Sequence, residues 1–367
     1  MEIPLINLKR QYLEIKEEIN NSIQEVINES SFCVGRQIKE FENNFANYLN
    51  IKHAIGVANG TAALHLALEA IDIKENDEII TTSNTFIATV EAICYQKAKP
   101  ILVDIDEETY TIDINKIEEK ITNKTKAIIP VHLFGHPCEM DAIKKIANKY
   151  NLKIIEDCAQ AHGVEYKGQK VGTIGDIGCF SMYPSKILGA YGDAGAIITN
   201  NYLFAEKIKK LKNHGESTKY NHELMGYNYR LDGIQAAILN VKLKYLNKWL
   251  EKRREIARIY NEEIKELVTI PSEKAFAKHG YYLYVIRAKE RNNLLEFLKI
   301  KGISCGIHYP IPIHLQLAYQ SLNMGETKLP ITERISKEIL SVPLYPEMTN
   351  EEIDYVINSI KEYFNKK

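Results

Sequence analysis

The chain lacks both a long uninterrupted apolar run and a surplus of charge of either sign. Its 47 Lys and Arg side chains are balanced by 48 Asp and Glu side chains, which gives a formal net charge of -1. The chain therefore has no basic excess that would point to nucleic acid or to an anionic membrane. No apolar run approaches the roughly 20 residues that cross a bilayer, and Met1–Arg10 have no signal-peptide core. We therefore expect a cytoplasmic protein that binds neither nucleic acid nor membrane.

Cysteine is also scarce and follows no ligand pattern. The six cysteines form no Cys-x-x-Cys pair and are scattered through apolar segments, at Cys33, Cys94, Cys138, Cys158, Cys179 and Cys305. This favours buried, reduced thiols over disulfides or zinc. His308 and His314 have no third ligand or carboxylate near them in sequence. A metal site is therefore not expected, and polar contacts to a substrate are the favoured interpretation.

Short apolar runs alternate with helical patterns after an amphipathic segment at 11–29. The runs lie at 54–57, 78–82, 100–103, 127–130 and 153–156, and the helical patterns lie at 62–72, 85–97, 113–121 and 139–150. Alternation of this kind predicts an α/β fold with a mainly parallel central sheet and helices on both faces. Ligands of such folds bind at the carboxyl ends of the strands.

The last third of the chain has a different pattern. One long helix is expected over 234–265, then a strand at 281–286 and a helix at 290–301. A Pro-rich loop at 309–313 and a final helix at 350–364 complete it. We predict a large domain at 1–245 and a smaller C-terminal α+β domain at 246–367.

Lys186 and Asp157 are the candidate catalytic residues. Lys186 lies in a glycine-punctuated stretch beside Tyr183, Ile187 and Leu188, whose apolar surface would favour a neutral, nucleophilic amine. Asp157 ends an apolar run, where its carboxylate can hold a protonated pyridine nitrogen. A Schiff-base lysine and such a carboxylate are what pyridoxal 5'-phosphate (PLP) requires. The alternatives are a surface lysine and an aspartate that caps the next turn.

A phosphate site is expected where the segment 59–68 opens a helix after a strand. Gly60 permits close backbone approach, and the amides of Thr61 and Ala62 would point at an anion. Ser181, five residues before Lys186, could add a hydroxyl. The alternative is a plain Asn-Gly turn capped by Thr61.

Two further side chains suit the cofactor ring. Phe86 opens the next helix and could stack on the ring, although a core aromatic is the alternative. Gln160 follows Asp157 on the same loop and could donate a hydrogen bond to the phenolic oxygen.

Several segments together resemble the DegT/DnrJ/EryC1/StrS family of sugar-nucleotide aminotransferases. The resemblance covers nearly the whole chain, and its specificity comes from the order and spacing of the segments. They lie at 59–61, 85–86, 100–106, 156–162, 181–186, 192–195 and 226–232.

The resemblance implies the aspartate aminotransferase-like architecture (PLP fold type I) and a role for each matching residue. Lys186 would form the Schiff base, Asp157 would pair with the ring nitrogen, Gln160 would contact the phenolic oxygen and Phe86 would stack on the ring. Thr61, Ala62 and Ser181 would hold the phosphate. Asn228 would reach the phosphate of a neighbouring subunit's cofactor, which implies a homodimer with shared sites.

The implied reaction moves an amino group from L-glutamate to a nucleotide-linked keto-sugar, with pyridoxamine 5'-phosphate as the intermediate form of the cofactor. The segments 214–222 and 306–316 look most like enzymes that aminate C3 of a dTDP-3-keto-6-deoxyhexose. Amination at C4 of a UDP- or GDP-4-keto sugar is the alternative. Candidate substrate contacts are Tyr183, Arg230, His308, Tyr309 and His314. For Arg230, an ion pair with Asp232 alone is the other interpretation.

Two other functions use the same scaffold. PLP-dependent sugar dehydratases resemble this family but have histidine at the position of Lys186, which argues against dehydration. A non-catalytic PLP-binding regulator is disfavoured, because the set of catalytic positions is complete and no basic DNA-binding segment is present. Tyr282 stands where a histidine is frequent in the family, which leaves substrate specificity open.

Overall fold

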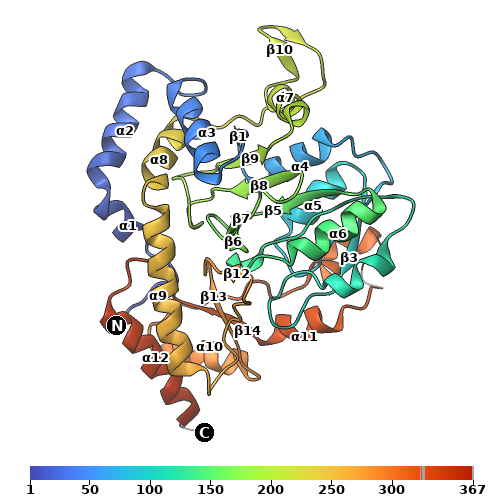
Figure 1. Cartoon of the computed structure of the whole chain (residues 1–367). Coiled ribbons are helices and arrows are strands. Elements are labelled where there is room, and N and C mark those ends of the chain that lie inside the picture. Colours follow the sequence, from blue (N-terminus) through green and yellow to red (C-terminus); the bar gives the residue numbers. More distant parts are fainter. Residues whose placement is uncertain (323, 325–326, 366–367) are drawn as a thin grey trace.

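A seven-stranded sheet lies at the centre of the computed structural model, which describes residues 1–322, 324 and 327–365. Its strand order is β1-β9-β8-β5-β4-β2-β3 (Figure 1). The strands are β1 (His53–Val57), β2 (Glu78–Thr82), β3 (Lys99–Val103), β4 (Thr125–Ile128), β5 (Lys153–Asp157), β8 (Ile177–Ser181) and β9 (Gly195–Thr199). Pairing is parallel from β8 through β5, β4 and β2 to β3, whereas β9 is antiparallel to both β8 and β1. The predicted mainly parallel sheet is confirmed.

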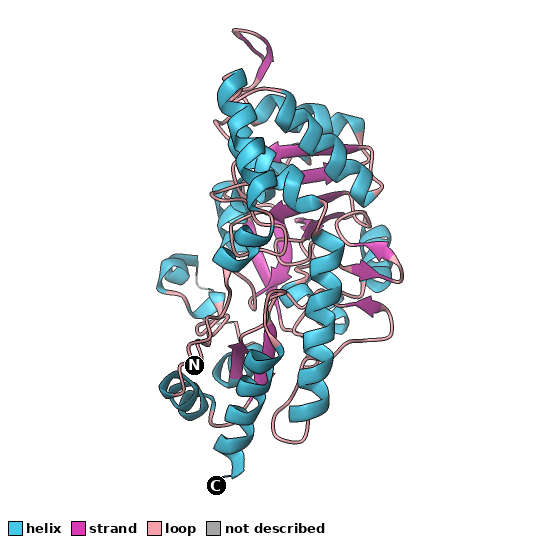
Figure 2. Ribbon diagram, turned by 90° about the vertical axis from the view of Figure 1, so that its left-hand side faces the viewer, coloured by secondary structure: helices cyan, strands magenta, loops and turns pink. Residues whose placement is uncertain are grey.

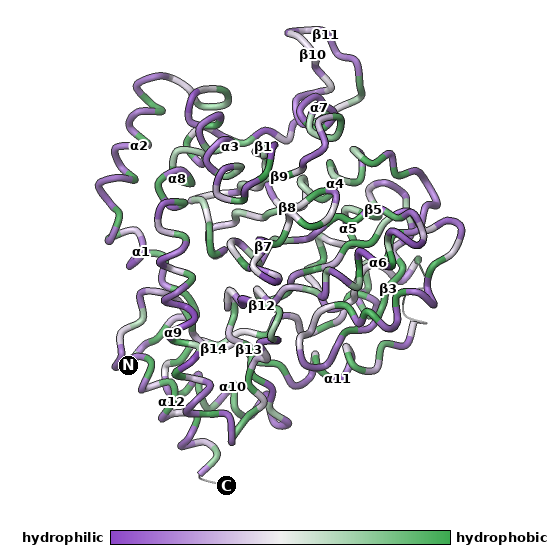
Figure 3. The backbone as a smooth tube through the Cα atoms, in the orientation of Figure 1, coloured by the Kyte–Doolittle hydropathy of each residue, from purple (hydrophilic) through white to green (hydrophobic). Residues whose placement is uncertain are grey.

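Alternate residues of each strand serve two different cores, as expected of a sheet buried on both faces. Ile80, Ile154 and Ile198 pack on one face, and their neighbours Ile79 and Ile155 pack on the other. The first face is covered by α3 (Arg36–Leu49), α6 (Met140–Tyr150) and α8 (Gly233–Leu243). The second face is covered by α4 (Gly60–Ala70), α5 (Ala88–Tyr95) and α7 (Tyr202–Leu211). Figure 2 shows helices on both sides of the strands, and in Figure 3 the outlying helix α2 is mainly purple, hydrophilic, whereas green, hydrophobic stretches run through the region of the central sheet.

The C-terminal part forms a separate core around a two-stranded antiparallel sheet. Its strands are β13 (Tyr284–Arg287) and β14 (Ile339–Val342), packed by α9 (Leu246–Ile264), α10 (Arg291–Ile300), α11 (Pro330–Glu338) and α12 (Asn350–Asn365). Ile3, at the N-terminus, is buried in this C-terminal core and forms a β-bridge with Ile303. The N-terminal segment therefore packs against the C-terminal core.

Two predicted helices are interrupted. The long helix expected over 234–265 is broken at Lys244 and Tyr245 into α8 and α9. The break follows from packing. The apolar face of α8 is buried against the first face of the central sheet, whereas Ile256 and Tyr260 of α9 are buried in the C-terminal core. The helix expected over 11–29 is divided at Ile15 into α1 (Leu8–Glu14) and α2 (Lys16–Glu29).

The helix expected at 113–121 is wrong in type. The structure has two short 3₁₀ helices there, Ile114–Lys116 and Glu118–Lys120. Ile117 is the residue of this segment that enters the large core as a fully buried side chain, so the segment has too little apolar surface to hold a longer α-helix. The strand predicted at 281–286 begins later, at Tyr284, because Tyr281 adopts a positive φ of 44°.

Lys242 places a buried amine in the packing between α8 and the N-terminal helices. Its side chain is fully buried and its Nζ atom has no hydrogen-bond partner among the described residues. The Nζ atom lies 5.0 Å from the ring centre of Tyr191 and 5.9 Å from that of Trp249. Burial lowers the pKa of Lys242 to about 7. At pH values between about 7 and the usual pKa of an unfolded lysine, the unfolded chain therefore binds this proton more readily than the folded chain does.

We predict that Lys242→Met stabilises the protein at neutral pH. Because the folded pKa is depressed, the cost of charging Lys242 is absent above the unfolded pKa and grows as pH falls toward 7. Removal of the amine should raise the free energy of unfolding at pH 7 by about 2–4 kcal/mol, after allowance for the aromatic rings around it. The gain should shrink toward zero near pH 10.5.

Urea unfolding at several pH values measures this effect. The control is Lys244→Met, which removes an exposed ion pair to Glu18 and should change stability by less than about 1 kcal/mol. A Lys242→Met variant that is no more stable than the parent at pH 7 would contradict the prediction.

Candidate active site

The pairing of β5 with β8 brings the two candidate catalytic residues together. The strands are parallel neighbours, and their register places Asp157 opposite Cys179. Lys186 lies in the turn after β8, where its backbone N–H donates to the carbonyl of Tyr183 at 2.8 Å. Both side chains reach one pocket at the carboxyl ends of these strands.

This pocket has a volume of about 580 Å³. Most predicted site residues line it: Gly60, Thr61, Phe86, Asp157, Gln160, Ser181, Tyr183, Lys186, His308 and Tyr309. The large core supplies most of the wall, and the C-terminal part closes it with Tyr282, His308 and Tyr309. The pocket is large enough for a cofactor and part of a substrate.

Asp157 is almost fully buried, and both carboxylate oxygens accept hydrogen bonds. The Thr89 hydroxyl donates to Oδ2 at 2.8 Å, and the backbone N–H of Ala159 donates to Oδ1 at 3.1 Å. Burial raises the pKa of Asp157, while these two donors and the Lys186 ammonium act in the opposite direction. Thr89 was missed in the sequence. Its signal was the spacing of four residues from Thr85 in a segment that opens a helix after β2.

The strand end that carries Asp157 is anchored by the neighbouring carboxylate. Glu156 is fully buried and accepts hydrogen bonds from the backbone N–H groups of Gly172, Ile174 and Gly175. His132 lies 2.9 Å from the same carboxylate. Glu156, His132 and Cys158 are close enough together to hold a metal ion. In this structure the Glu156 oxygens are taken up by hydrogen bonds, which gives the carboxylate a structural role.

The Lys186 amine lies over an aromatic ring of the C-terminal part. Its Nζ atom is 4.7 Å from the ring centre of Tyr282, within the range of a cation–π contact. The Tyr282 hydroxyl is 3.5 Å from that of Ser185. The sequence marked Tyr282 only as a departure from a family pattern, and nothing in it indicated contact with Lys186.

The N-terminus of α4 forms the expected anion site in part. Asn59 caps the helix by accepting the backbone N–H of Ala62 at 2.8 Å, so the Ala62 amide already has a partner. Ala62 does not line the pocket, whereas Gly60 and Thr61 do. A methyl group at Gly60 would lie 2.6 Å from Cβ of Ser181, so only glycine allows this helix to approach β8 so closely.

Gln160 is held in one orientation. Its Oε1 accepts the backbone N–H of Phe134 at 2.7 Å, and its Nε2 donates to the Tyr309 hydroxyl at 3.1 Å. The second Nε2 hydrogen remains for a ligand. The rings of Tyr309 and Phe86 are 5.8 Å apart, and Phe86 is 53% exposed. An aromatic side chain so exposed at a pocket wall offers a stacking surface.

His308 is held as a neutral side chain. Its Nδ1 is 2.9 Å from the Ser341 hydroxyl. Burial, and secondarily the charge of Lys186, lower the pKa of His308. At neutral pH it can therefore offer a hydrogen bond to a substrate without adding charge to the pocket.

Besides Ala62, three predicted substrate or cofactor contacts lie outside the pocket wall. His314 is buried between Ser83 and Glu333, and its two ring nitrogens lie 2.8 and 3.2 Å from their side chains. The prediction of a substrate contact by His314 is therefore replaced by a structural role. Asn228 bridges to Asn213 through the backbone. Arg230 donates to the Asn213 side chain at 3.0 Å rather than pairing with Asp232.

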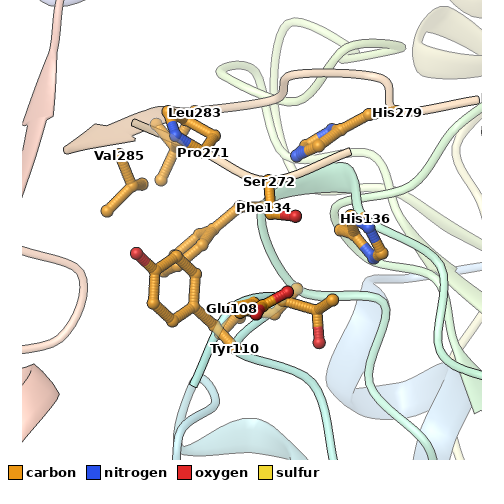
Figure 4. A pocket seen from close by; sticks show the side chains of 11 residues that line it. Glu108, Tyr110, Phe134, His136, Pro271, Ser272, His279, Leu283 and Val285 are labelled. Carbon is orange, nitrogen blue, oxygen red and sulfur yellow. The ribbon is translucent and has the colours of Figure 1, made fainter. Parts of the chain in front are cut away.

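Another hollow, between the large core and the segment before β13, is too small for a substrate. Tyr110, Phe134, His136 and His279 contribute to its wall, and Figure 4 shows their side chains around it. Its volume is about 10 Å³, comparable to the space that one water molecule needs. Burial lowers the pKa of His136 to about 4, which leaves it neutral at physiological pH.

The residues of the larger pocket fit PLP. They provide an amine for the aldehyde, a buried carboxylate for the ring nitrogen and an exposed aromatic face for the ring. The helix N-terminus beside Ser181 provides donors for a phosphate. No described helix is long and apolar enough to cross a membrane.

Comparisons with known proteins identify the family to which the chain belongs. The sequence model of the DegT/DnrJ/EryC1/StrS aminotransferase family matches residues 13–361. The chain is 44% identical to a pleiotropic regulatory protein of Geobacillus stearothermophilus, over 99% of both chains. It is 45% identical to dTDP-3-amino-3,6-dideoxy-alpha-D-galactopyranose transaminase of Aneurinibacillus thermoaerophilus, over 98% of this chain and 99% of that one. The crystal structure of S. venezuelae DesV in complex with a ketimine intermediate superposes with a TM-score of 0.97 at 36% identity, covering 99% of this chain and 98% of that one.

We predict that Gly60→Ala weakens PLP binding. The added methyl group would force Ser181 and the α4 N-terminus apart, and both belong to the anion site. The dissociation constant of PLP should rise by about tenfold or more, the effect of misplacing one or two hydrogen bonds to a charged group. Titration of the apoprotein with PLP, followed by fluorescence, measures it.

Gly168→Ala is the control for this prediction. A methyl group at Gly168 meets no atom within 4 Å, but the residue has a φ of +80°. This variant should lose stability through backbone strain and keep its PLP affinity. Equal affinity losses in the two variants would contradict a local role of Gly60.

Proposed function

Because the chain belongs to the DegT/DnrJ/EryC1/StrS aminotransferase family, a family of PLP-dependent enzymes, we propose that it transfers an amino group from L-glutamate to C3 of a dTDP-3-keto-6-deoxyhexose. The product would be a dTDP-3-amino-3,6-dideoxyhexose. The observation that carries the aminotransferase assignment is the meeting of Lys186, Asp157 and the α4 N-terminus in one pocket.

Each catalytic residue has a role that its position supports. Bound PLP supplies an electron sink for the charge left when a proton is removed from a substrate carbon. Lys186 would bond the cofactor covalently and, once displaced by the amino donor, would carry the proton between the donor α-carbon and cofactor carbon C4'. Asp157 would hold the proton on the ring nitrogen, because a carboxylate favours the charged ring.

The remaining contacts follow the walls of the pocket. Phe86 would stack on the ring, and the free Nε2 hydrogen of Gln160 would reach the phenolic oxygen. Gly60, Thr61 and Ser181 would hold the phosphate, with the Ala62 amide kept by Asn59 as a helix cap. Tyr183, His308 and Tyr309 would contact the sugar nucleotide.

The choice of substrate is supported by the relatives and not by a distinct contact in this pocket. The dTDP carrier and the C3 position follow the name of the Aneurinibacillus thermoaerophilus relative. The segments 214–222 and 306–316, which resemble those of C3 enzymes, include His308 and Tyr309 of the pocket wall.

We also propose a homodimer with shared sites. The hairpin of β10 (Glu216–Thr218) and β11 (Asn221–His222) projects from the body of the subunit (Figures 1 and 2). Tyr220 in the turn of this hairpin and Met225 just after it are 81% and 96% accessible. Asn228 follows this hairpin and lies outside its own subunit's pocket wall, as expected if it serves the pocket of a second copy.

Lys186→Ala should lose the absorbance band of the lysine-bound cofactor and at least about 1,000-fold in turnover, because one group is both nucleophile and proton carrier. Release of 2-oxoglutarate from glutamate in the presence of keto-sugar measures turnover. Lys248→Ala, at an exposed lysine, should behave as the parent. Normal turnover in Lys186→Ala would overturn the assignment. No turnover in the parent with any keto-sugar would favour a PLP-binding regulator.

A substrate panel tests the proposed sugar. The parent enzyme is offered 3-keto and 4-keto 6-deoxyhexoses on dTDP, UDP and GDP, and NMR of the product locates the new amine. We expect the highest kcat/KM for the dTDP-3-keto sugar, with nitrogen on C3. Nitrogen on C4 of a UDP or GDP sugar would select the alternative, and loss of a hydroxyl without gain of nitrogen would indicate a dehydratase.

The shared site predicts complementation between two defective variants. Asn228→Ala alone should weaken PLP binding, and Lys186→Ala alone should be inactive. In a mixed dimer, one pocket carries both defects and the other carries neither, so mixing should restore up to about one quarter of the parent activity when the subunits exchange at random. If Asn228 serves its own pocket, mixing will restore no activity beyond the sum of the two variants.

A further inference from the structure

A chain of two buried hydroxyl groups ends on Asp157. Thr89 donates from Oγ1 to Asp157 Oδ2 at 2.8 Å, and Thr85 Oγ1 lies 2.9 Å from Thr89 Oγ1. Thr85 and Thr89 are 3% and 1% exposed, and both line the pocket. The two hydroxyls are therefore shielded from water and lie next to any ligand bound in the pocket.

The direction of both hydrogen bonds is fixed by counting protons. A threonine hydroxyl has one hydrogen. Thr89 uses its hydrogen on the carboxylate, so the hydrogen between the two hydroxyls must come from Thr85. Thr85 then donates to Thr89 and Thr89 to Asp157, an arrangement in which each bond strengthens the next.

Thr89 is the second residue of α5, so no turn of this helix precedes it whose carbonyl could compete for the hydroxyl. The hydroxyl is directed out of α5 to the end of β5. With Oδ1 held by the Ala159 amide, the carboxylate is fixed at both oxygens and cannot turn its plane.

We propose that Thr89, supported by Thr85, is a positioning residue for the cofactor. It holds Asp157 ionised and oriented so that the carboxylate accepts a hydrogen bond from the protonated ring nitrogen. Neither threonine exchanges protons in the reaction. The inference deepens the proposed role of Asp157 and rests on it.

Thr89→Val tests the role because it keeps the shape of the side chain and removes the donor. The PLP dissociation constant should rise about 10- to 100-fold at neutral pH, the value of a hydrogen bond to a charged group. Thr89→Ser restores the donor and should bind within about threefold of the parent. Thr85→Val leaves the Thr89–Asp157 hydrogen bond in place, so this variant should lose less PLP affinity than Thr89→Val.

The matched control is Thr81→Val in β2. The Thr81 hydroxyl is equally buried and donates to the Ile129 carbonyl at 2.9 Å, with no contact to Asp157. Both valine variants should lose similar stability in urea unfolding, but only Thr89→Val should lose PLP affinity. Equal affinity losses in the two variants, or none in either, would overturn the inference.

Two readouts separate positioning from general damage. Without the Thr89 donor, Asp157 takes up a proton more readily, so PLP affinity should begin to fall at a higher pH on the acid side than in the parent. With PLP labelled with ¹⁵N in the ring, NMR should show a less protonated ring nitrogen in Thr89→Val and an unchanged one in Thr81→Val.

Asp157→Asn distinguishes the two levels of the argument. If Asp157→Asn binds PLP with a normal, protonated ring nitrogen, the proposed role of Asp157 itself is wrong. If Asp157→Asn fails in this test while Thr89→Val matches the parent, only the role of Thr89 is wrong.

Discussion

The parallel pairing of β5 with β8 is the constraint on which the site depends. It places the end of one buried strand, at Asp157, beside the strand that leads to Lys186. A carboxylate as deeply buried as that of Asp157 requires hydrogen-bond donors around it. The amine of Lys186 is positioned by the turn that carries this residue. Glu156 meets part of this requirement by binding three backbone N–H groups behind the strand end. The sheet thus places Asp157 at a strand end and Lys186 on the turn that follows the neighbouring strand.

The same constraint explains how much of the site could be predicted from sequence. Lys186, Asp157, Gly60 and Ser181 lie on segments that begin or end at buried strands, so their positions follow from strand–helix alternation. Five of the seven strands, β1 to β5, were predicted because each of them contains a short apolar run, whereas β8 and β9 were not predicted. The helix over 234–265 was predicted as one because its apolar period does not record that α8 and α9 face different cores.

Contacts between distant segments could not be predicted in this way. Tyr282 reaches Lys186 from the C-terminal part, and Tyr309 reaches Gln160 across 149 residues of sequence. In the sequence, His314 appeared equivalent to His308. In the fold, however, His314 is buried between Ser83 and Glu333. No local pattern distinguishes two such histidines, because the difference is made by what packs against them.

The buried polar groups of this chain fall into two kinds, and the difference is physical. Asp157 and Glu156 are surrounded by donors, so their burial stabilises a defined geometry. Lys242 has aromatic rings around it and no hydrogen-bond acceptor among the described residues, so its burial costs stability without fixing a ligand. Desolvation acts on both kinds, and only the surrounding hydrogen bonds decide whether a buried charge is retained. At the end of β5, the hydrogen bonds to Asp157 and Glu156 therefore serve two purposes at once. They stabilise the buried carboxylates, and they fix the geometry proposed for cofactor binding.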